Sequence, residues 1–223
     1  MTYESFIEEL KLYAEEEFKI FQERLIFTSF KILGVRTPVL RKLAKKYESE
    51  IKSVIAFPND YYEVVFIKLC MVSALPYKQF LGYLDECVGL MDNWALCDSF
   101  KPKCVRANRT EFLKELERIF HHGGEFYERF VFVMILNYYV EEEYYSLIKY
   151  YLKRADKQKY YVHMAVAWLV AEILIKLPAL GEKILKDRLL DAKTHNKAIQ
   201  KAKESFRVDK ERKERLNELK IKK

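Results

Sequence analysis

Apolar residues recur at spacings of three and four along most of the chain, which is the period of an amphipathic α-helix. The first such stretch is marked by Phe6, Leu10, Tyr13, Phe18 and Phe21, and it predicts one helical segment near the N-terminus. No run alternates convincingly with the period of two that a β-hairpin requires. The pattern therefore predicts an all-α chain.

Residues that start or stop helices divide this pattern into segments. Thr37 followed by Pro38 predicts a helix start, with the hydroxyl as N-cap and proline at the first helical position. The run "HHGG", residues 121–124, predicts a helix end. Thr194 is expected to cap a helix that runs from 195 towards 206, and Asp209 to cap a last one. The helix that starts at Thr37 is expected to continue to residue 47. The other helices are expected over residues 61–74, 77–90, 92–100, 112–120, 125–139, 142–152, 157–177 and 180–190.

These segments amount to about a dozen helices of roughly 8 to 20 residues, joined by short connections. Helix pairs recur about every 35 to 45 residues, the scale of HEAT-like and armadillo-like repeats, although no literal repeat is visible. We expect a curved solenoid of such repeats, an ARM-type fold, as a single domain over residues 1–208; a globular bundle is the alternative. Residues 209–223 are expected to form a basic helix or tail that packs on this domain or extends it.

Composition supports the helical interpretation and limits the class of protein. Six glycines and five prolines are few for 223 residues, and all-β sandwiches usually need more turns. The opening sequence is charged and periodic, so no secretory signal is expected. No apolar run approaches the roughly 20 residues that span a bilayer. We therefore expect a cytoplasmic protein with no membrane partner.

The four cysteines form no CxxC pair. Cys97 and Cys104 could be combined with His121 and His122 as metal ligands, but this spacing fits no zinc pattern. Free thiols in a reducing compartment are the favoured interpretation. We expect neither a metal nor a cofactor.

Positive charge is concentrated at the C-terminal end. From Lys193 onward, twelve basic and five acidic residues carry a net charge of +7, which equals the net charge of the whole chain. The preceding 192 residues therefore carry a net charge of zero. A basic end suggests a polyanion partner, most often nucleic acid, although a solvated, lysine-rich terminal helix would carry the same charge.

A tryptophan and a carboxylate lie one helical turn apart in "MDNWALCDSF", residues 91–100. Trp94 and Asp98 are four positions apart, so on a helix they share one face. Such a pair could present an aromatic wall and a negative charge to one ligand. In the simpler interpretation, Trp94 fills the core and Asp98 ends its helix ahead of Pro102.

Four further segments accompany "DNWALCD": "ILGVRTPVLRKLAKKY" (32–47), "FYERFVFVMILNYYV" (126–140), "YYVHMAVAWLVAEIL" (160–174) and "THNKAIQKAKESFRV" (194–208). Together, in this order, they resemble the AlkD-like DNA alkylation repair family from about residue 18 to residue 208. The resemblance implies a right-handed stack of HEAT-like repeats whose basic concave surface holds duplex DNA. It also implies a DNA glycosylase that releases cationic alkylated purines, chiefly N3-alkyladenine and N7-alkylguanine, without rotating the base into a pocket.

The resemblance also implies roles for single residues. Asp98 is similar to the catalytic carboxylate of the family. Trp94 and Trp168 are similar to the aromatic pair that flanks the deoxyribose, and Arg129 to the basic residue that lines the cleft. Arg129 could alternatively form a surface ion pair with a neighbouring glutamate, and Trp168 could be plain core.

Two helix starts supply the expected contacts with the DNA backbone, because free N–H groups and a partial positive charge gather there. In the first, Arg36, Thr37 and Arg41 match the family's turn and helix start. The "THNKAIQK" segment (194–201) has the same features, a hydroxyl residue at a predicted helix start followed by basic residues. The DNA-binding residues expected from the two segments are Arg36, Thr37, Arg41, Lys45, Thr194, Asn196, Lys197 and Lys201.

The implied chemistry gives its own reason for these residue types. A purine alkylated at N3 or N7 is already cationic, so it can leave without a general acid. What needs stabilisation is the sugar as C1′ becomes oxocarbenium-like. A carboxylate provides this electrostatically and can orient the attacking water, while the negative face of an indole favours the developing positive charge.

Two departures from the family pattern keep other hypotheses open. Leu25 stands where a tyrosine is expected, and Ala171 and Glu172 stand where a basic residue follows the second tryptophan. The leading hypothesis is a monomeric glycosylase whose partner is duplex DNA containing alkylated bases, associated with the nucleoid when bound. The alternatives are a non-catalytic helical-repeat protein that binds distorted or branched DNA, and a protein-binding solenoid whose basic tail aids solubility.

Overall fold

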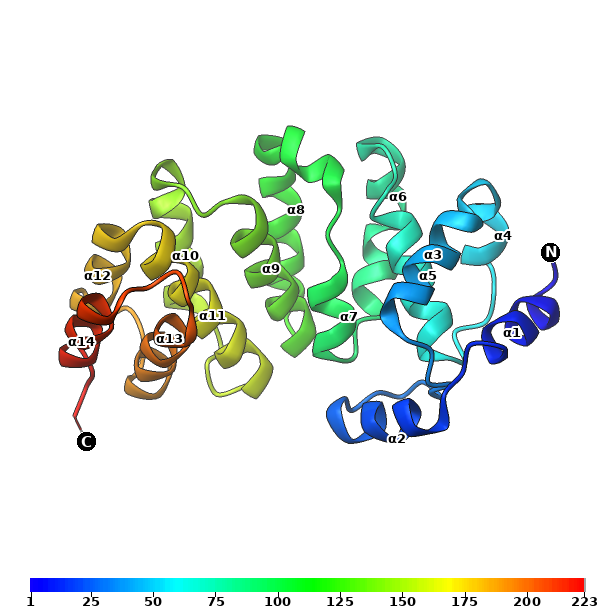
Figure 1. Ribbon diagram of the computed structural model, residues 1–223. Coiled ribbons are helices and arrows are strands. Elements are labelled where there is room, and N and C mark those ends of the chain that lie inside the picture. The colour runs from blue at the N-terminus through cyan, green and yellow to red at the C-terminus, as the bar shows by residue number, and fades with distance from the viewer. Residues whose placement is uncertain (223) are drawn as a thin grey trace. The chain divides into compact units, whose positions relative to one another are not determined.

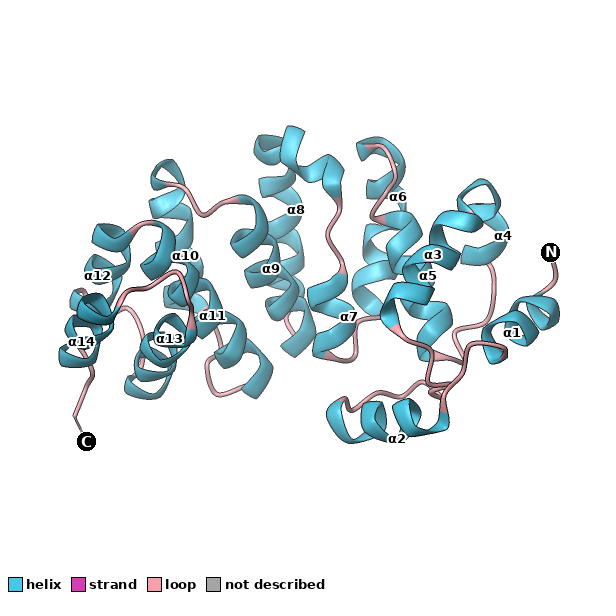
Figure 2. Ribbon diagram, viewed as in Figure 1, coloured by secondary structure: helices cyan, strands magenta, loops and turns pink. Residues whose placement is uncertain are grey.

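The computed structural model describes residues 1–222, and over these residues the chain is helical without any β-strand (Figures 1 and 2). Within residues 1–222, fourteen α-helices, α1 to α14, follow one another with short 3₁₀ turns between some of them. The all-α prediction and the helical repeat architecture are confirmed, while the curved, right-handed course of the stack stays a prediction. Within residues 1–222, none of the helices combines the length and the apolar character that a bilayer crossing needs.

The helices form two compact units, one over residues 1–108 and one from residue 109 onward. No composition shift in the sequence marks this division, and the sequence pattern predicted one domain over residues 1–208. The first unit contains α1 (Tyr3–Lys11), α2 (Glu16–Leu25), α3 (Thr37–Lys46), α4 (Ile51–Ile55), α5 (Tyr62–Val72), α6 (Tyr77–Gly89) and α7 (Trp94–Ser99).

Helix α5 is the centre of the first unit. Ten of its eleven residues are buried, and α3, α4, α6 and α7 all pack against it. Its apolar side chains therefore face neighbours on every side, as expected of a core helix. Two charged side chains nevertheless lie on it, Glu63 at 0% exposure and Lys68 at 2%.

Both buried charges on α5 bind backbone groups of loops. The Glu63 carboxylate accepts N–H bonds from Leu33, Gly34 and Val35, the nearest at 2.9 Å. Burial raises the pKa of Glu63, and the backbone donors oppose this rise. Lys68 donates to the Phe57 carbonyl and to Asn59 Oδ1. Glu63 thereby fixes the turn that leads directly into α3.

The first apolar stretch forms two helices, so the single N-terminal segment predicted from the pattern is wrong. Helix α1 ends at Lys11 and α2 begins at Glu16. Between them, Leu12 is 82% exposed and Tyr13 is 44% exposed. These side chains continue the helical pattern in sequence, but no part of the core lies within their reach.

The second unit contains α8 (Arg109–His122), α9 (Glu125–Tyr138), α10 (Tyr145–Arg154), α11 (Tyr160–Lys176), α12 (Pro178–Lys186), α13 (Ala192–Glu204) and α14 (Lys210–Glu218). Helix α11 is its centre and packs against α9, α12 and α13. The predicted stop at "HHGG" is confirmed, since α8 ends there and both glycines have positive φ. The basic C-terminal helix α14 packs on α13.

Two of the three predicted hydroxyl or carboxylate caps need correction. Thr37 is the first residue of α3, the N-cap position belongs to Arg36, and no side chain caps this end. The N-cap of α13 is Asp191, whose carboxylate accepts the N–H of Thr194 at 3.0 Å. Thr194 therefore lies inside the first turn of α13 and does not cap it. Asp209 caps α14 as predicted.

The geometry of the turn before α3 predicts how a substitution at Gly34 changes the stability of the fold. Gly34 has φ +89°, and an added Cβ would lie 2.6 Å from the Glu15 carbonyl oxygen and 2.7 Å from Lys19 Cβ. Gly34→Ala should therefore lower the free energy of unfolding by about 1–3 kcal/mol, measured by urea denaturation. Gly82→Ala is the control, since that helical glycine has open space around it. It should raise the free energy of unfolding by about 0.5–1 kcal/mol. Equal effects of the two changes would contradict this account.

Candidate active site

Trp94 and Asp98 lie on the wall of one cavity in the first unit. The cavity has a volume of about 310 Å³. Its lining comes from α2, α3, α5 and α7 and from the segment after α7: Phe18, Phe21, Gln22, Leu25, Ile26, Thr37, Arg41, Tyr62, Trp94, Ala95, Asp98, Ser99 and Lys101. The predicted sharing of one helical face is therefore observed, and both side chains are half-buried.

The start of α7 is fixed by two polar residues just before it. The fully buried Asn93 accepts N–H bonds from Ala95 and Leu96 at 3.0 and 3.1 Å, so it is the N-cap. Asp92 accepts bonds from the hydroxyls of Thr28 and Ser29, which holds the loop after α2 against this end. A short helix anchored in this way presents its side chains in a defined direction.

The indole of Trp94 is held against the end of α2. Its Nε1 donates to the Leu25 carbonyl at 3.3 Å. The side chain of Leu25, at the position where the family resemblance predicted a tyrosine, lines the same cavity and is 48% exposed. An aliphatic group therefore occupies that part of the wall.

Positive side chains share this cavity with Asp98. Arg41, on the exposed side of α3, and Lys101, just after α7, both line it, and Thr37 lies at the start of α3 beside them. Lys101 was not predicted from the sequence, although its place three residues after Asp98 was a usable signal. One wall thus carries an aromatic face and a carboxylate, with two cations nearby, and can accommodate a ligand that has both anionic and cationic parts.

Arg36 and Lys45 belong to the same segment but do not line the cavity. The guanidinium of Arg36 makes a bidentate contact with Glu15, 2.7 Å at its nearest, and lies 4.8 Å from the Phe18 ring centroid. This contact lowers the pKa of the Glu15 carboxyl. Lys45 is exposed one helical turn beyond Arg41.

In the second unit, Arg129 and Trp168 have different environments. Arg129, on α9, is only 5% exposed, and its Nη1 donates to the Tyr161 carbonyl at 2.8 Å. The Tyr161 N–H in turn donates to Glu125 at 2.6 Å, so two side chains of α9 bind the backbone of the first turn of α11. Trp168, on α11, is half-buried although its sequence neighbours are apolar.

The second departure from the family pattern has a structural explanation. Ala171 is 2% exposed and points into the core, where a basic side chain would be buried. Glu172, one turn from Trp168, is bound by Arg207 at 2.6 and 2.9 Å and by Lys176 at 3.2 Å. These cations lower the pKa of Glu172, the hydrogen bond from Arg207 being the largest cause. The negative charge beside Trp168 is therefore compensated.

The residues predicted on α13 are not equally available to a ligand. Thr194 is fully buried and donates its hydroxyl to Asp191 at 2.6 Å, so its side chain is closed to a DNA phosphate. Asn196 exchanges two hydrogen bonds with the Ile221 backbone. Lys197 donates to Gln200, and Lys201 pairs with Glu204 at the surface.

Over residues 1–222, no cluster of three or more His, Cys, Asp or Glu is arranged to hold a metal ion. The four cysteines form no disulfide, and burial raises the pKa of the Cys70 thiol to about 11. A thiol with a raised pKa is mainly protonated and weakly nucleophilic at neutral pH.

Comparison with known families identifies the family of this chain. The family model described as DNA alkylation repair enzyme matches residues 6–205, which includes every candidate residue discussed above. No curated protein matches the chain.

The ion pairs of Glu172 predict how stability depends on pH. Because the folded-state pKa of Glu172 is depressed, its stabilising effect is present above the carboxyl's ordinary pKa and is lost as the pH falls through the folded-state pKa. Glu172→Gln should therefore lower the melting temperature at pH 7, with a difference from wild type that shrinks below about pH 4. Glu8→Gln, a change at an exposed position in the middle of α1, is the control and should have little effect at either pH. A Glu172→Gln difference that is independent of pH would contradict this assignment.

Proposed function

The chain belongs to the family of DNA alkylation repair enzymes, and from this we propose that it is a DNA glycosylase acting on cationic alkylated purines in duplex DNA. N3-alkyladenine and N7-alkylguanine are the proposed substrates. The bond that breaks is the N-glycosidic bond between the damaged base and C1′ of its deoxyribose.

The observation that carries this proposal is the shared position of Asp98 and Trp94 on one cavity with Arg41 and Lys101. The carboxylate is half-buried, so it acts in a medium of lower effective dielectric constant than bulk water. The cations can bind phosphates on either side of a lesion, which would leave the carboxylate directed at the sugar between them.

The reaction can be written without a general acid. The alkylated purine carries a positive charge, so the electron pair of the glycosidic bond leaves with the base and neutralises it. Positive charge then develops on C1′ and the ring oxygen, where Asp98 stabilises it. Water adds to C1′ and releases its proton, and Asp98 can orient this water. An abasic sugar and a neutral purine are the products.

Aromatic and buried groups would support this step. The face of Trp94 would contact the sugar, because the negative quadrupole of an indole favours the partial positive charge on its C–H groups. Trp168 is proposed as the second aromatic residue of the site. Arg129, which is buried and bound to the Tyr161 carbonyl, is a positioning residue for the start of α11 in this proposal.

The proposed DNA-binding residues follow from exposure. In the first unit they are Thr37, Arg41 and Lys101, with Arg36 and Lys45 beside them on the same segment. In the second unit they are Asn196, Lys197 and Lys201. We leave out Thr194, whose hydroxyl is buried and committed to Asp191.

A second function, non-catalytic binding of distorted or branched DNA, is favoured by one observation. The family's basic residue after the second tryptophan is replaced by Ala171, which is buried, so α11 offers no cation at this point. In this alternative the cavity around Asp98 would have no catalytic role. It predicts tight binding to DNA junctions and no abasic product.

Asp98→Asn tests the catalytic assignment. The substitution keeps the shape of the side chain and removes its charge, so release of N7-methylguanine from methylated duplex DNA should fall about a hundredfold or more. DNA affinity, measured by fluorescence anisotropy, should stay within about twofold of wild type or rise, because a negative charge near the phosphates is lost.

The matched control is Asp85→Asn, the same change at an exposed position of α6 outside the cavity. It should leave excision at the wild-type rate. If the Asp98→Asn variant excised the base at the wild-type rate, Asp98 would have no catalytic role. An absence of excision by the wild-type protein itself, together with tight junction binding, would favour the second function.

Arg41→Gln tests the proposed phosphate contact. One fewer phosphate contact should weaken binding to undamaged duplex DNA and reduce the slope of log K against log salt by about 0.9. Lys11→Gln, a loss of the same charge at an exposed position of α1, is the control and should leave the slope unchanged. Identical slopes for wild type and Arg41→Gln would exclude this contact.

A further inference from the structure

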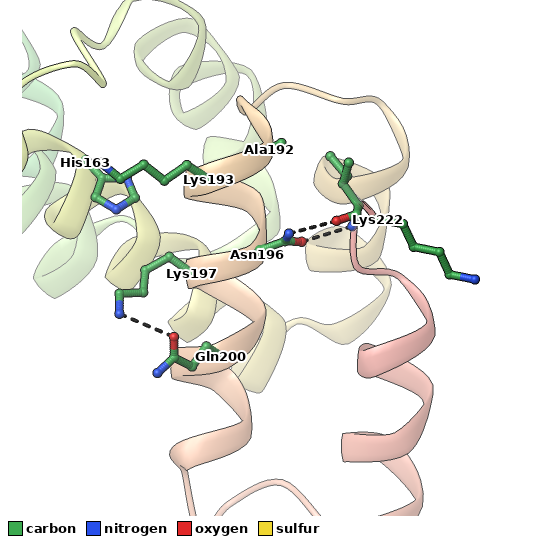
Figure 3. A pocket seen from close by; sticks show the side chains of 8 residues that line it. His163, Ala192, Lys193, Asn196, Lys197, Gln200 and Lys222 are labelled. Carbon is green, nitrogen blue, oxygen red and sulfur yellow. Dashed lines mark hydrogen bonds between the residues drawn. The ribbon is translucent and has the colours of Figure 1, made fainter.

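A second cavity, of about 540 Å³, lies in the second unit beside α13, and none of its lining residues lines the cavity of Asp98. Figure 3 shows Lys193 and Lys197 extending from α13 on the side where the His163 ring of α11 lies. The residues that line the cavity are His163, Ala192, Lys193, Asn196, Lys197, Gln200, Ile221 and Lys222. The proposed function uses two of these residues, Asn196 and Lys197, as contacts to DNA and gives no role to His163 or Lys193.

The hydrogen bonds around His163 assign the proton on its ring. The Thr194 hydroxyl donates its single proton to the Asp191 carboxylate at 2.6 Å. The same oxygen lies 2.8 Å from His163 Nδ1, so Nδ1 must be the donor in that contact. The neutral ring therefore carries its proton on Nδ1 and its lone pair on Nε2.

His163 Nε2 is left to face a ligand. The residue is 2% exposed and lines the cavity, and the one hydrogen bond that its ring makes within residues 1–222 is the one at Nδ1. Nε2 is not among the buried unpartnered side-chain atoms of residues 1–222, so it is reached from the cavity and can accept a hydrogen bond from a molecule bound there. The chain Asp191–Thr194–His163 would hold the ring in place while Nε2 accepts.

The charges that face His163 are mainly positive. Burial is the largest cause that lowers the pKa of His163, Lys193 and Lys197 lower it further, and Asp191 opposes them. The ring is therefore neutral at pH 7. The Asp191 carboxylate is already occupied as the N-cap of α13 and as the acceptor of the Thr194 hydroxyl, while Gln200 holds the Lys197 ammonium in place.

A ligand for this cavity must combine negative charge with one proton that Nε2 can accept. A phosphodiester carries charge but no proton at neutral pH. A phosphomonoester has a second pKa near 6, so it can supply both the charge and the shared proton. Two ammonium groups would bind its oxygens through charge-assisted hydrogen bonds.

We propose that the cavity formed by His163, Lys193 and Lys197 binds a phosphomonoester, such as the terminal phosphate at a DNA nick or a free nucleotide. This site does not depend on the excision activity proposed for Asp98. Its occupation is coupled to a proton, since one proton is shared between the phosphate and Nε2 in the complex. Affinity therefore falls as the pH rises above the second pKa of the phosphate.

The test compares nicked duplex DNA that carries a 5′-phosphate with the same duplex carrying a 5′-hydroxyl, by fluorescence anisotropy. Wild-type protein should bind the phosphorylated nick about tenfold more tightly, with the preference decreasing between about pH 6 and pH 8. Competition by deoxyadenosine monophosphate identifies a free nucleotide as a ligand. A preference for the phosphorylated nick without such competition identifies the DNA end. Equal binding of both nicked duplexes, together with no binding of the nucleotide, overturns the proposal.

Two variants assign the effect to these residues. In His163→Asn, the amide can still donate to Thr194, but the acceptor at Nε2 is lost, so the preference should fall to about twofold or less. Because a change at a buried position can affect folding, the exposed Lys193→Gln is the second variant, and it should also reduce the preference. Lys153→Gln, the same charge change on α10 outside the cavity, is the control and should keep it. Full preference in both His163→Asn and Lys193→Gln would exclude this site.

Discussion

The first unit depends on one buried carboxylate. Glu63 lies on the central helix α5 with no exposed surface and binds the consecutive N–H groups of Leu33, Gly34 and Val35. A buried charge is tolerated only where several donors satisfy it. Here those donors belong to the turn that enters α3, so the same interaction that satisfies Glu63 also fixes where α3 begins. Arg41 reaches the cavity of Asp98 because α3 starts at that place.

The second unit uses a comparable arrangement around its own central helix. His163 on α11 contacts Thr194, which contacts Asp191, the N-cap of α13. In both units, a buried polar side chain on the central helix contacts the start of a neighbouring helix. These internal hydrogen bonds therefore hold helix starts, where the backbone carries a partial positive charge.

Membership of the DNA alkylation repair enzyme family agrees with the distribution of charge on the described residues. The carboxylate of Asp98 has cations on its own cavity wall. Glu172, the acidic residue nearest in sequence to Trp168, is neutralised by Arg207 and Lys176. A protein that approaches polyanionic DNA loses affinity for every uncompensated carboxylate on its binding face. The two ion pairs of Glu172 compensate its carboxylate.

The sequence by itself determined the helical class, most helix positions, the stop at the two glycines, and the shared face of Trp94 and Asp98. All of these depend on spacing along the chain, which is local information. Tertiary structure decided the rest. Leu12 and Tyr13 have the apolar pattern of a helix but lie exposed, because burial depends on what packs opposite. Asp191, and not Thr194, is the N-cap of α13, and Thr194 is buried against His163, a residue 31 positions away. The division into two units and the burial of Ala171 likewise depend on contacts between distant segments. Spacing along the sequence gives no information about such contacts.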